Sequence, residues 1–172
     1  DFKVIGTTAS IEVTKLTNST YDLTLKGGDL ANLNEFVTID IVTTADIMDL
    51  AGNALTPEAP DLMEAYVVDN TAPLISSFTR NSPTVEQTNA DELTFLATFN
   101  EPVVEVDAAD FSAIGTTGTI EVSMVTDSIY KVTIKGGDLA TITGKVGLDF
   151  TNLMEEIQAN LSILDSAGNV FI

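Results

Sequence analysis

Residues 110–150 read DFSAIGTTGTIEVSMVTDSIYKVTIKGGDLATITGKVGLDF, and they repeat residues 1–41, which read DFKVIGTTASIEVTKLTNSTYDLTLKGGDLANLNEFVTIDI. The offset is a constant 109 residues, and about half of the paired positions are identical. A period of this length corresponds to one small domain. Tandem copies of a small domain favour spacers and binding arrays over enzymes, because reach and avidity grow with copy number whereas catalysis needs a single site.

The two copies begin and end at different points of the repeat. Residues 71–109 precede the second copy and have no counterpart before the first, whereas residues 57–69 follow the first copy and are missing after the second. Between them, VVDNTAPLI (67–75) reads as a linker, because Pro73 lacks a backbone donor and favours an extended residue before it. We therefore expect a partial domain over residues 1–69 and a nearly complete domain over residues 70–172.

Short runs of β-branched and alternating apolar residues predict strands, and turn-rich segments such as NSPT, TDS and GGDL separate them. Seven short strands at spacings of about 8 to 12 residues are typical of an immunoglobulin-like sandwich. The predicted fold is all-β: tandem immunoglobulin-like β-sandwich repeats of about seven strands each, the first lacking its opening strands A and B. The runs are 74–80, 92–99, 110–115, 119–125, 129–135 and 145–150 in the second copy and 62–69 in the first.

One segment of the second copy departs from this pattern. Residues 152–161 have the apolar spacing of a short helix. They lie in a seven-residue excess of the second copy, around Glu155 and Glu156. This excess alters the spacing to Asp165 relative to the first copy.

The composition excludes several classes of function. With 26 acidic and 7 basic residues, a net charge of −19, the chain repels nucleic acid and anionic lipid surfaces. No apolar run approaches the roughly 18 to 20 residues that span a bilayer. Histidine and cysteine are absent, which removes imidazole bases, Ser-His-Asp triads, thiolate sites and disulfides. We expect no catalysis, no nucleic-acid partner and no membrane insertion.

Three acidic segments are predicted to meet at one end of the second domain. Following the strands alternately down and up brings the linker, the loop 101–110 and the loop 164–169 to the same end. Carboxylates in irregular loops suit Ca²⁺, which takes six to eight oxygen ligands at about 2.3–2.6 Å. The candidate ligands ranked first are Asp69, Glu101, Asp107 and Asp165, followed by Asn70, Asp110, Asn169 and, in the first copy, Asp49.

These motifs also have plainer interpretations. DxAGN occurs at 49–53 and at 165–169, and it is ordinary turn chemistry in which Gly takes a positive φ and the Asp side chain bonds the backbone. Asp49 belongs to the first copy, which lacks the loops that would join it in a metal site. Asp110 opens its strand as Asp1 does and could serve only as a cap. KGGDL lacks the frame of a phosphate loop, so we interpret it as a turn.

Taken together, several motifs of the chain resemble those of a known family of repeats. VDNTAP at the junction, FNEPV after the second strand, VDAADF, KGGDL in both copies and DxAGN near the end together resemble the bacterial immunoglobulin-like repeats of very large secreted adhesins. The resemblance implies an extracellular extender segment at the bacterial cell surface, whose partners are neighbouring repeats of the parent chain. It also implies Ca²⁺ near the junctions that stiffens the array.

Two other functions stay open from the sequence. One is a glycan- or protein-binding module, which an exposed aromatic cluster would identify, and for which Tyr21, Tyr130 and Phe171 are scattered along the chain. The other is an accessory domain of a secreted polysaccharide-degrading enzyme. A first copy without strands A and B has open apolar edges. We expect these edges to be covered by strand exchange with another copy, by the second copy or by a missing segment.

Overall fold

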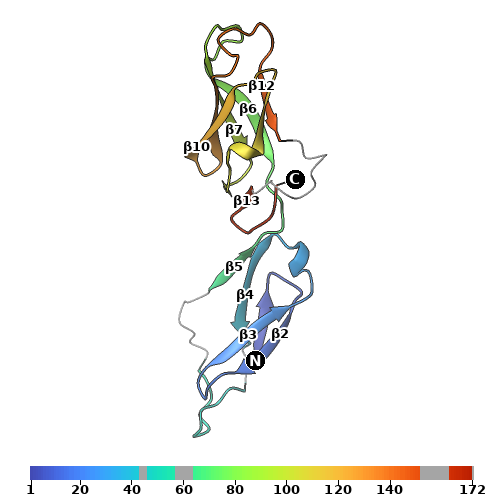
Figure 1. Cartoon of the computed structure of the whole chain (residues 1–172). Coiled ribbons are helices and arrows are strands. Elements are labelled where there is room, and N and C mark those ends of the chain that lie inside the picture. Colours follow the sequence, from blue (N-terminus) through green and yellow to red (C-terminus); the bar gives the residue numbers. More distant parts are fainter. Residues whose placement is uncertain (43–45, 57–63, 152–162, 172) are drawn as a thin grey trace. The chain divides into compact units, whose positions relative to one another are not determined.

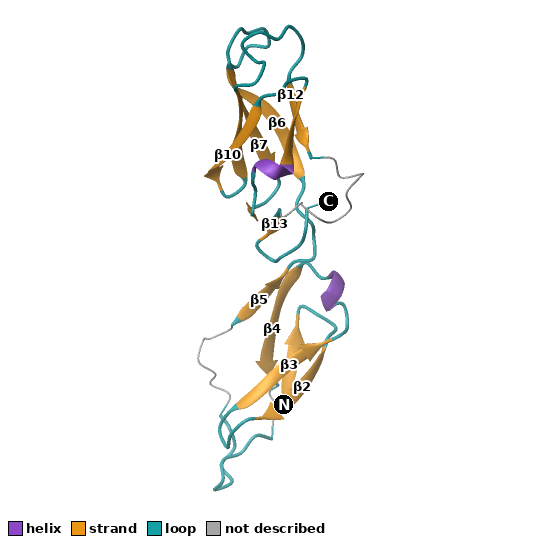
Figure 2. Ribbon diagram, viewed as in Figure 1, coloured by secondary structure: helices purple, strands orange, loops and turns teal. Residues whose placement is uncertain are grey.

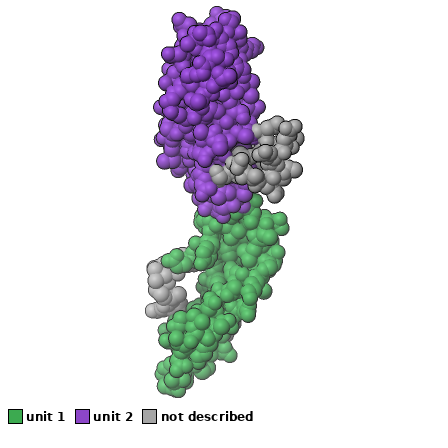
Figure 3. Space-filling view, in the orientation of Figure 1, with its two compact units in different colours: residues 1–71 green, residues 72–172 purple. Residues whose placement is uncertain are grey.

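The computed structural model describes residues 1–42, 46–56, 64–151 and 163–171. Over these ranges the chain is all-β, with two short 3-10 turns and no α-helix. It divides into two compact units, residues 1–71 and 72–172 (Figure 3), and each is described by itself. The division falls two residues beyond the boundary placed from the sequence. The segment suggested as a helix, 152–161, lies outside the described residues.

Unit 2 contains a four-stranded antiparallel sheet with the order β10-β11-β7-β6, and two strand pairs, β12 with β9 and β13 with β8 (Figures 1 and 2). The six runs predicted for this copy appear as strands with ends within two residues of those expected. The pair β8–β13 was not predicted. The elements are β6 (Ile75–Ser82), β7 (Glu92–Phe99), β8 (Val103–Val104), η2 (Ala108–Asp110), β9 (Phe111–Ile114), β10 (Thr119–Thr126), β11 (Ile129–Lys135), β12 (Gly147–Phe150) and β13 (Leu164–Asp165).

The core of unit 2 joins the four-stranded sheet to the strand pairs, so the unit is built as a two-layer sandwich. Phe99 of β7 is 3 % exposed and packs edge-to-face on Tyr130 of β11, with ring centroids 6.0 Å apart, and on Phe171, 5.9 Å away. Removing such large apolar surfaces from water is the main stabilising contribution to a domain of this size. The buried cluster consists of Ala97, Phe99, Val103, Phe111, Tyr130, Val132, Ile163 and Phe171.

Unit 1 repeats part of this arrangement. Its sheet has the order β1-β4-β5, and β2 pairs with β3 in a hairpin. At the offset of 109 residues, β1 to β4 correspond to β9 to β12, and none of the described strands of unit 1 corresponds to β6 or β7. The elements are β1 (Phe2–Ile5), β2 (Ser10–Lys15), β3 (Tyr21–Lys26), η1 (Leu30–Asn32), β4 (Glu35–Ile41) and β5 (Ala65–Val68).

Without described strands equivalent to β6 and β7, the apolar side of unit 1 is exposed. Tyr21 is 51 % exposed, whereas its counterpart Tyr130 is 5 % exposed. Among the described residues of unit 1, only Ala9 and Val37 are buried apolar residues. Over its described residues, unit 1 therefore has part of a sandwich without the strands that close it in unit 2.

Tyr130 and Tyr21 occupy equivalent positions, so they can test whether the tyrosine contributes to stability only where it is buried. In unit 2 the Tyr130 hydroxyl donates a hydrogen bond to the Val103 carbonyl oxygen at 2.7 Å, in a buried position. Because Tyr130→Phe leaves that carbonyl without this donor, we expect unit 2 to lose about 1 kcal/mol of unfolding free energy. Tyr21→Phe should be neutral within about 0.5 kcal/mol, because its ring is half exposed. Denaturant unfolding of both variants measures the difference, and equal losses would contradict it.

Candidate metal centre

Three of the four acids ranked first from the sequence lie together. Asp69, Glu101 and Asp165 each offer a carboxylate oxygen, and these oxygens lie within 4.8 Å of one another. Asp165 is buried, and the other two are half-buried. Two oxygens that share one ion at about 2.4 Å are up to about 5 Å apart. The three-acid cluster, as we call these residues, could therefore hold a metal ion.

Asp165 ends β13 and organises the turn that follows it. Its Oδ1 accepts hydrogen bonds from the backbone N–H groups of Ala167 and Asn169, both at 2.8 Å, and its Oδ2 accepts one from the Asn169 amide at 2.7 Å. Burial by itself would raise the pKa of Asp165, but these hydrogen bonds outweigh it and hold the pKa below its usual value. A carboxylate has about four acceptor positions, so Oδ2 retains capacity for a cation.

Asp49 makes the same turn in unit 1. Its Oδ1 accepts from the N–H groups of Ala51 and Asn53, and its Oδ2 accepts from the Asn53 amide, all at 2.8 Å. The hydrogen bonds from Asn53 lower the pKa of Asp49. Asp49 is exposed, and within the described part of the chain it joins no group of three acids. The DxAGN motif is thus a turn in both units, and only Asp165 also belongs to the three-acid cluster.

The other two members of the cluster are placed by short local contacts. Asp69 lies in the connecting segment, residues 69–73, and its Oδ1 accepts from the Thr71 N–H at 2.9 Å. Glu101 follows β7, where the side-chain oxygen of Asn100 accepts from the Leu74 N–H at 2.6 Å. The Asn100 amide also reaches Glu101 Oε1 at 3.3 Å. These contacts hold the chain just after Asp69 and just before Glu101.

Asp107 and Asp110 instead form the cap of η2. Asp107 Oδ1 accepts from the Ala109 N–H, and Asp110 Oδ2 accepts from the Asp107 N–H, both at 2.7 Å. This reciprocal pattern is a capping box. Neither residue belongs to the three-acid cluster. For Asp110 the cap agrees with the role considered from the sequence, and Asp107 shares that cap.

The two asparagine candidates differ in their surroundings. Asn169 lies against Asp165 through the hydrogen bond already described, so it adjoins the cluster. The Asn70 amide donates to the carbonyl oxygens of Leu30 and Leu33, at 3.0 and 2.7 Å, and its backbone N–H donates to Asn34. Asn70 therefore anchors the end of unit 1 to the loop around η1.

A polar role for KGGDL was missed from the sequence, although the interpretation as a turn is confirmed. Asp138 accepts hydrogen bonds from the Thr116 hydroxyl at 2.6 Å and from the Thr117 N–H at 2.9 Å. A Cβ on Gly137 (φ +59°) would lie 2.5 Å from the Thr117 backbone, so only glycine fits. Asp29 makes the equivalent contacts with Thr7 and Thr8. The joint identity of IGTT and KGGDL in both copies was the available signal.

Comparisons of the chain with protein-family models, characterised proteins and solved structures give no significant match. Among the described residues, no helix has the length and apolar character needed to cross a bilayer.

Proposed function

We propose that this chain is a structural spacer segment of a large bacterial cell-surface adhesin, in which Ca²⁺ bound by the three-acid cluster stiffens the tandem array. The observation that carries the proposal is the convergence of Asp69, Glu101 and Asp165. They come from the connecting segment and from two loops that are far apart in sequence. Oxygen ligands from irregular loops are what Ca²⁺ binds in extracellular modules.

Electrostatics explains how the ion would act. Three carboxylates at this spacing repel one another, and the chain carries 26 acidic residues against 7 basic ones. A bound divalent cation replaces this repulsion with attraction and ties Asp69 of the connecting segment to the loops that hold Glu101 and Asp165. Extracellular calcium modules have a Kd of about 10⁻⁴ to 10⁻³ M. Free ion at ten times Kd adds about 1.4 kcal/mol per site, which accumulates over many repeats.

The strand order of unit 2 supports the immunoglobulin-like assignment. When the strands are lettered along the chain, β6, β7, β11 and β10 take the places of A, B, E and D, and the observed order is D-E-B-A. The pair β9–β12 takes the places of C and F. This is the order found in immunoglobulin-like sandwiches. Together with the resemblance to bacterial surface repeats, it favours a spacer.

The alternative of a binding module gains no support from the three aromatic residues considered from the sequence. Of the three aromatic residues considered for an exposed cluster, Tyr130 and Phe171 are core residues, 5 % and 4 % exposed. Only Tyr21 is exposed. Surface recognition through these aromatics is thus not favoured.

Calcium titration tests the proposal. We expect added Ca²⁺ to raise the melting temperature of unit 2, and to increase the length of the chain measured by X-ray scattering. Glu101→Gln should abolish most of both effects, because an amide is a much weaker calcium ligand than a carboxylate. This variant keeps the shape of the side chain and leaves the Asp165 turn intact.

The matched control is Glu86→Gln. Glu86 is exposed in unit 2 and lies outside the three-acid cluster, so the variant changes the net charge equally and should keep the full response to calcium. The proposal would be contradicted if calcium changed neither the melting temperature nor the length of the wild-type chain. It would also be contradicted if both variants lost the calcium response equally.

A further inference from the structure

An apolar groove of about 610 Å³ opens in unit 1. Its walls come from the hairpin strand β3 and from the sheet β1-β4-β5, so it lies where the two layers of a sandwich would enclose a core. The groove is large enough for several side chains of an extended strand. Its apolar lining includes Phe2, Leu23, Leu25, Val37, Ile39 and Tyr66.

Unit 2 shows what occupies the equivalent place in the other copy of the repeat. There β11 pairs along its whole length with β7, from Ile129 opposite Thr98 to Lys135 opposite Glu92. From β7, Ala97 and Phe99 enter the core, at 0 % and 3 % exposure. The outer edge of β7 then pairs with β6. The hairpin β6–β7 thus supplies both an edge strand and part of the core.

The corresponding strand of unit 1, β3, has one edge without such a partner. Over the described residues β3 pairs with β2 alone. A free sheet edge beside an apolar face is the arrangement that accepts an added strand, with the backbone groups providing affinity and the alternate side chains providing specificity.

We propose that unit 1 binds a β-hairpin with the chemistry of residues 75–99, whose second strand adds antiparallel to the free edge of β3 and fills the groove. The occupant is a hairpin of this repeat type rather than a small apolar ligand, because a small ligand would leave the edge of β3 unpaired. The offset of 109 residues transfers the register of β11 and β7 to the new pair. It places Tyr21 opposite a residue equivalent to Ala97, and Lys26 opposite one equivalent to Glu92.

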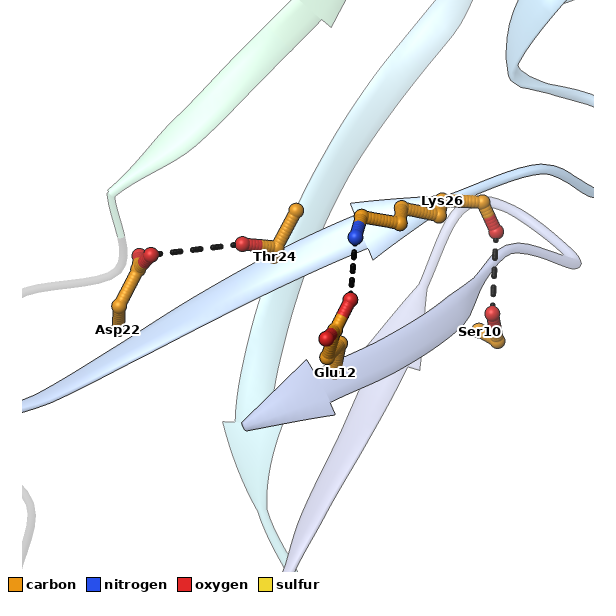
Figure 4. A network of polar contacts seen from close by, with 5 residues as sticks. All are labelled: Ser10, Glu12, Asp22, Thr24 and Lys26. Carbon is orange, nitrogen blue, oxygen red and sulfur yellow. Dashed lines mark hydrogen bonds and ion pairs between the residues drawn. The ribbon is translucent and has the colours of Figure 1, made fainter. Parts of the chain in front are cut away.

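The hairpin β2–β3, which would receive the added strand, has cross-strand polar contacts like those of its counterpart in unit 2. Figure 4 shows the Lys26 ammonium paired with Glu12, and the Ser10 hydroxyl bonded to the Lys26 carbonyl oxygen. Unit 2 has the same cross-strand ion pair, Lys135 with Glu121 at 2.6 Å. Since the two receiving hairpins match on this face, what differs in unit 1 is the open edge and the apolar face, which are the surfaces that a β6–β7 hairpin covers.

A synthetic peptide of residues 74–100, added to the full chain in EDTA, tests the proposal without involving calcium. We expect saturable one-to-one binding by calorimetry. Ala97→Glu in the peptide should weaken binding at least about tenfold, because it places an unpaired charge in the core. Glu92→Gln should change affinity less than about threefold, because Glu92 is exposed and exposed charges contribute little. Both changes are made in the peptide, so the folding of the chain is unaffected.

Hydrogen exchange locates the bound peptide. Backbone amides of β3 should become protected, while those of β11 stay unchanged because β11 is already paired with β7. Absence of saturable binding, equal binding of the Ala97→Glu peptide, or protection confined to unit 2 would each overturn the proposal. A stable dimer of the chain that the peptide does not dissociate would also overturn it, since a second copy would then fill the groove.

Discussion

Replacing Phe99 with alanine is expected to lower the free energy of unfolding of unit 2 by about 4 kcal/mol. The ring is 3 % exposed and lies between three aromatic neighbours, Tyr130, Phe150 and Phe171, with centroid distances of 6.0, 6.5 and 5.9 Å. These neighbours come from β11, from β12 and from the end of the chain. They cannot all collapse into the space left by the ring, so the variant loses both the apolar transfer energy and the contacts around a cavity.

The matched control is Phe36→Ala in unit 1. Phe36 is 67 % exposed, so the same chemical change should cost less than about 0.5 kcal/mol. Denaturant unfolding followed by circular dichroism measures both variants. A loss below about 1 kcal/mol for Phe99→Ala, or equal losses for the two variants, would show that Phe99 does not hold the sandwich layers together.

The strands of both units were predictable because their apolar residues alternate over four or more positions. In β10, for example, Ile120 and Val122 face the core cluster, with the exposed Glu121 between them. The pair β8–β13 escaped prediction because strands of two residues carry no periodicity. Such a pair forms only after tertiary contacts have brought its two segments together.

The candidate metal centre was predictable from chain direction, because antiparallel strands return alternate loops to the same end of a domain. This reasoning identified Asp69, Glu101 and Asp165. For Asp107 the prediction stays a prediction, because an aspartate that caps a short helical turn and an aspartate that binds an ion look alike in a loop sequence. What sequence spacing does not show is the hydrogen bond between the Asp107 carboxylate and the Ala109 N–H, which is part of the η2 cap.

Burial was the other property that sequence could not supply. Asp49 and Asp165 begin identical DxAGN turns with the same three hydrogen bonds, yet Asp165 is 3 % exposed and Asp49 is exposed. The difference arises because Asp165 belongs to β13 and pairs with Val103 of β8, a buried residue of the unit 2 core.

This difference gives the second large prediction. In metal-free buffer we expect Asp165→Ala to lower the unfolding free energy of unit 2 by about 3 kcal/mol, because it removes a buried, charged side chain that accepts three hydrogen bonds in its turn. Asp49→Ala should cost much less in unit 1, because water can replace the exposed carboxylate. Unfolding in EDTA measures both changes, and equal effects would mean that burial does not set the cost.

Comparing the wild-type chain with the Asp165→Ala variant separates the structural role of Asp165 from cation binding. Hydrogen bonds lower the pKa of Asp165 in the folded state, so its stabilisation is present above the ordinary carboxyl pKa and is lost as pH falls through the lowered value. The gap in stability between the wild-type chain and Asp165→Ala should therefore persist at neutral pH without calcium and shrink in strong acid. If it vanishes on adding EDTA at neutral pH, the turn is held by a bound ion rather than by its own hydrogen bonds.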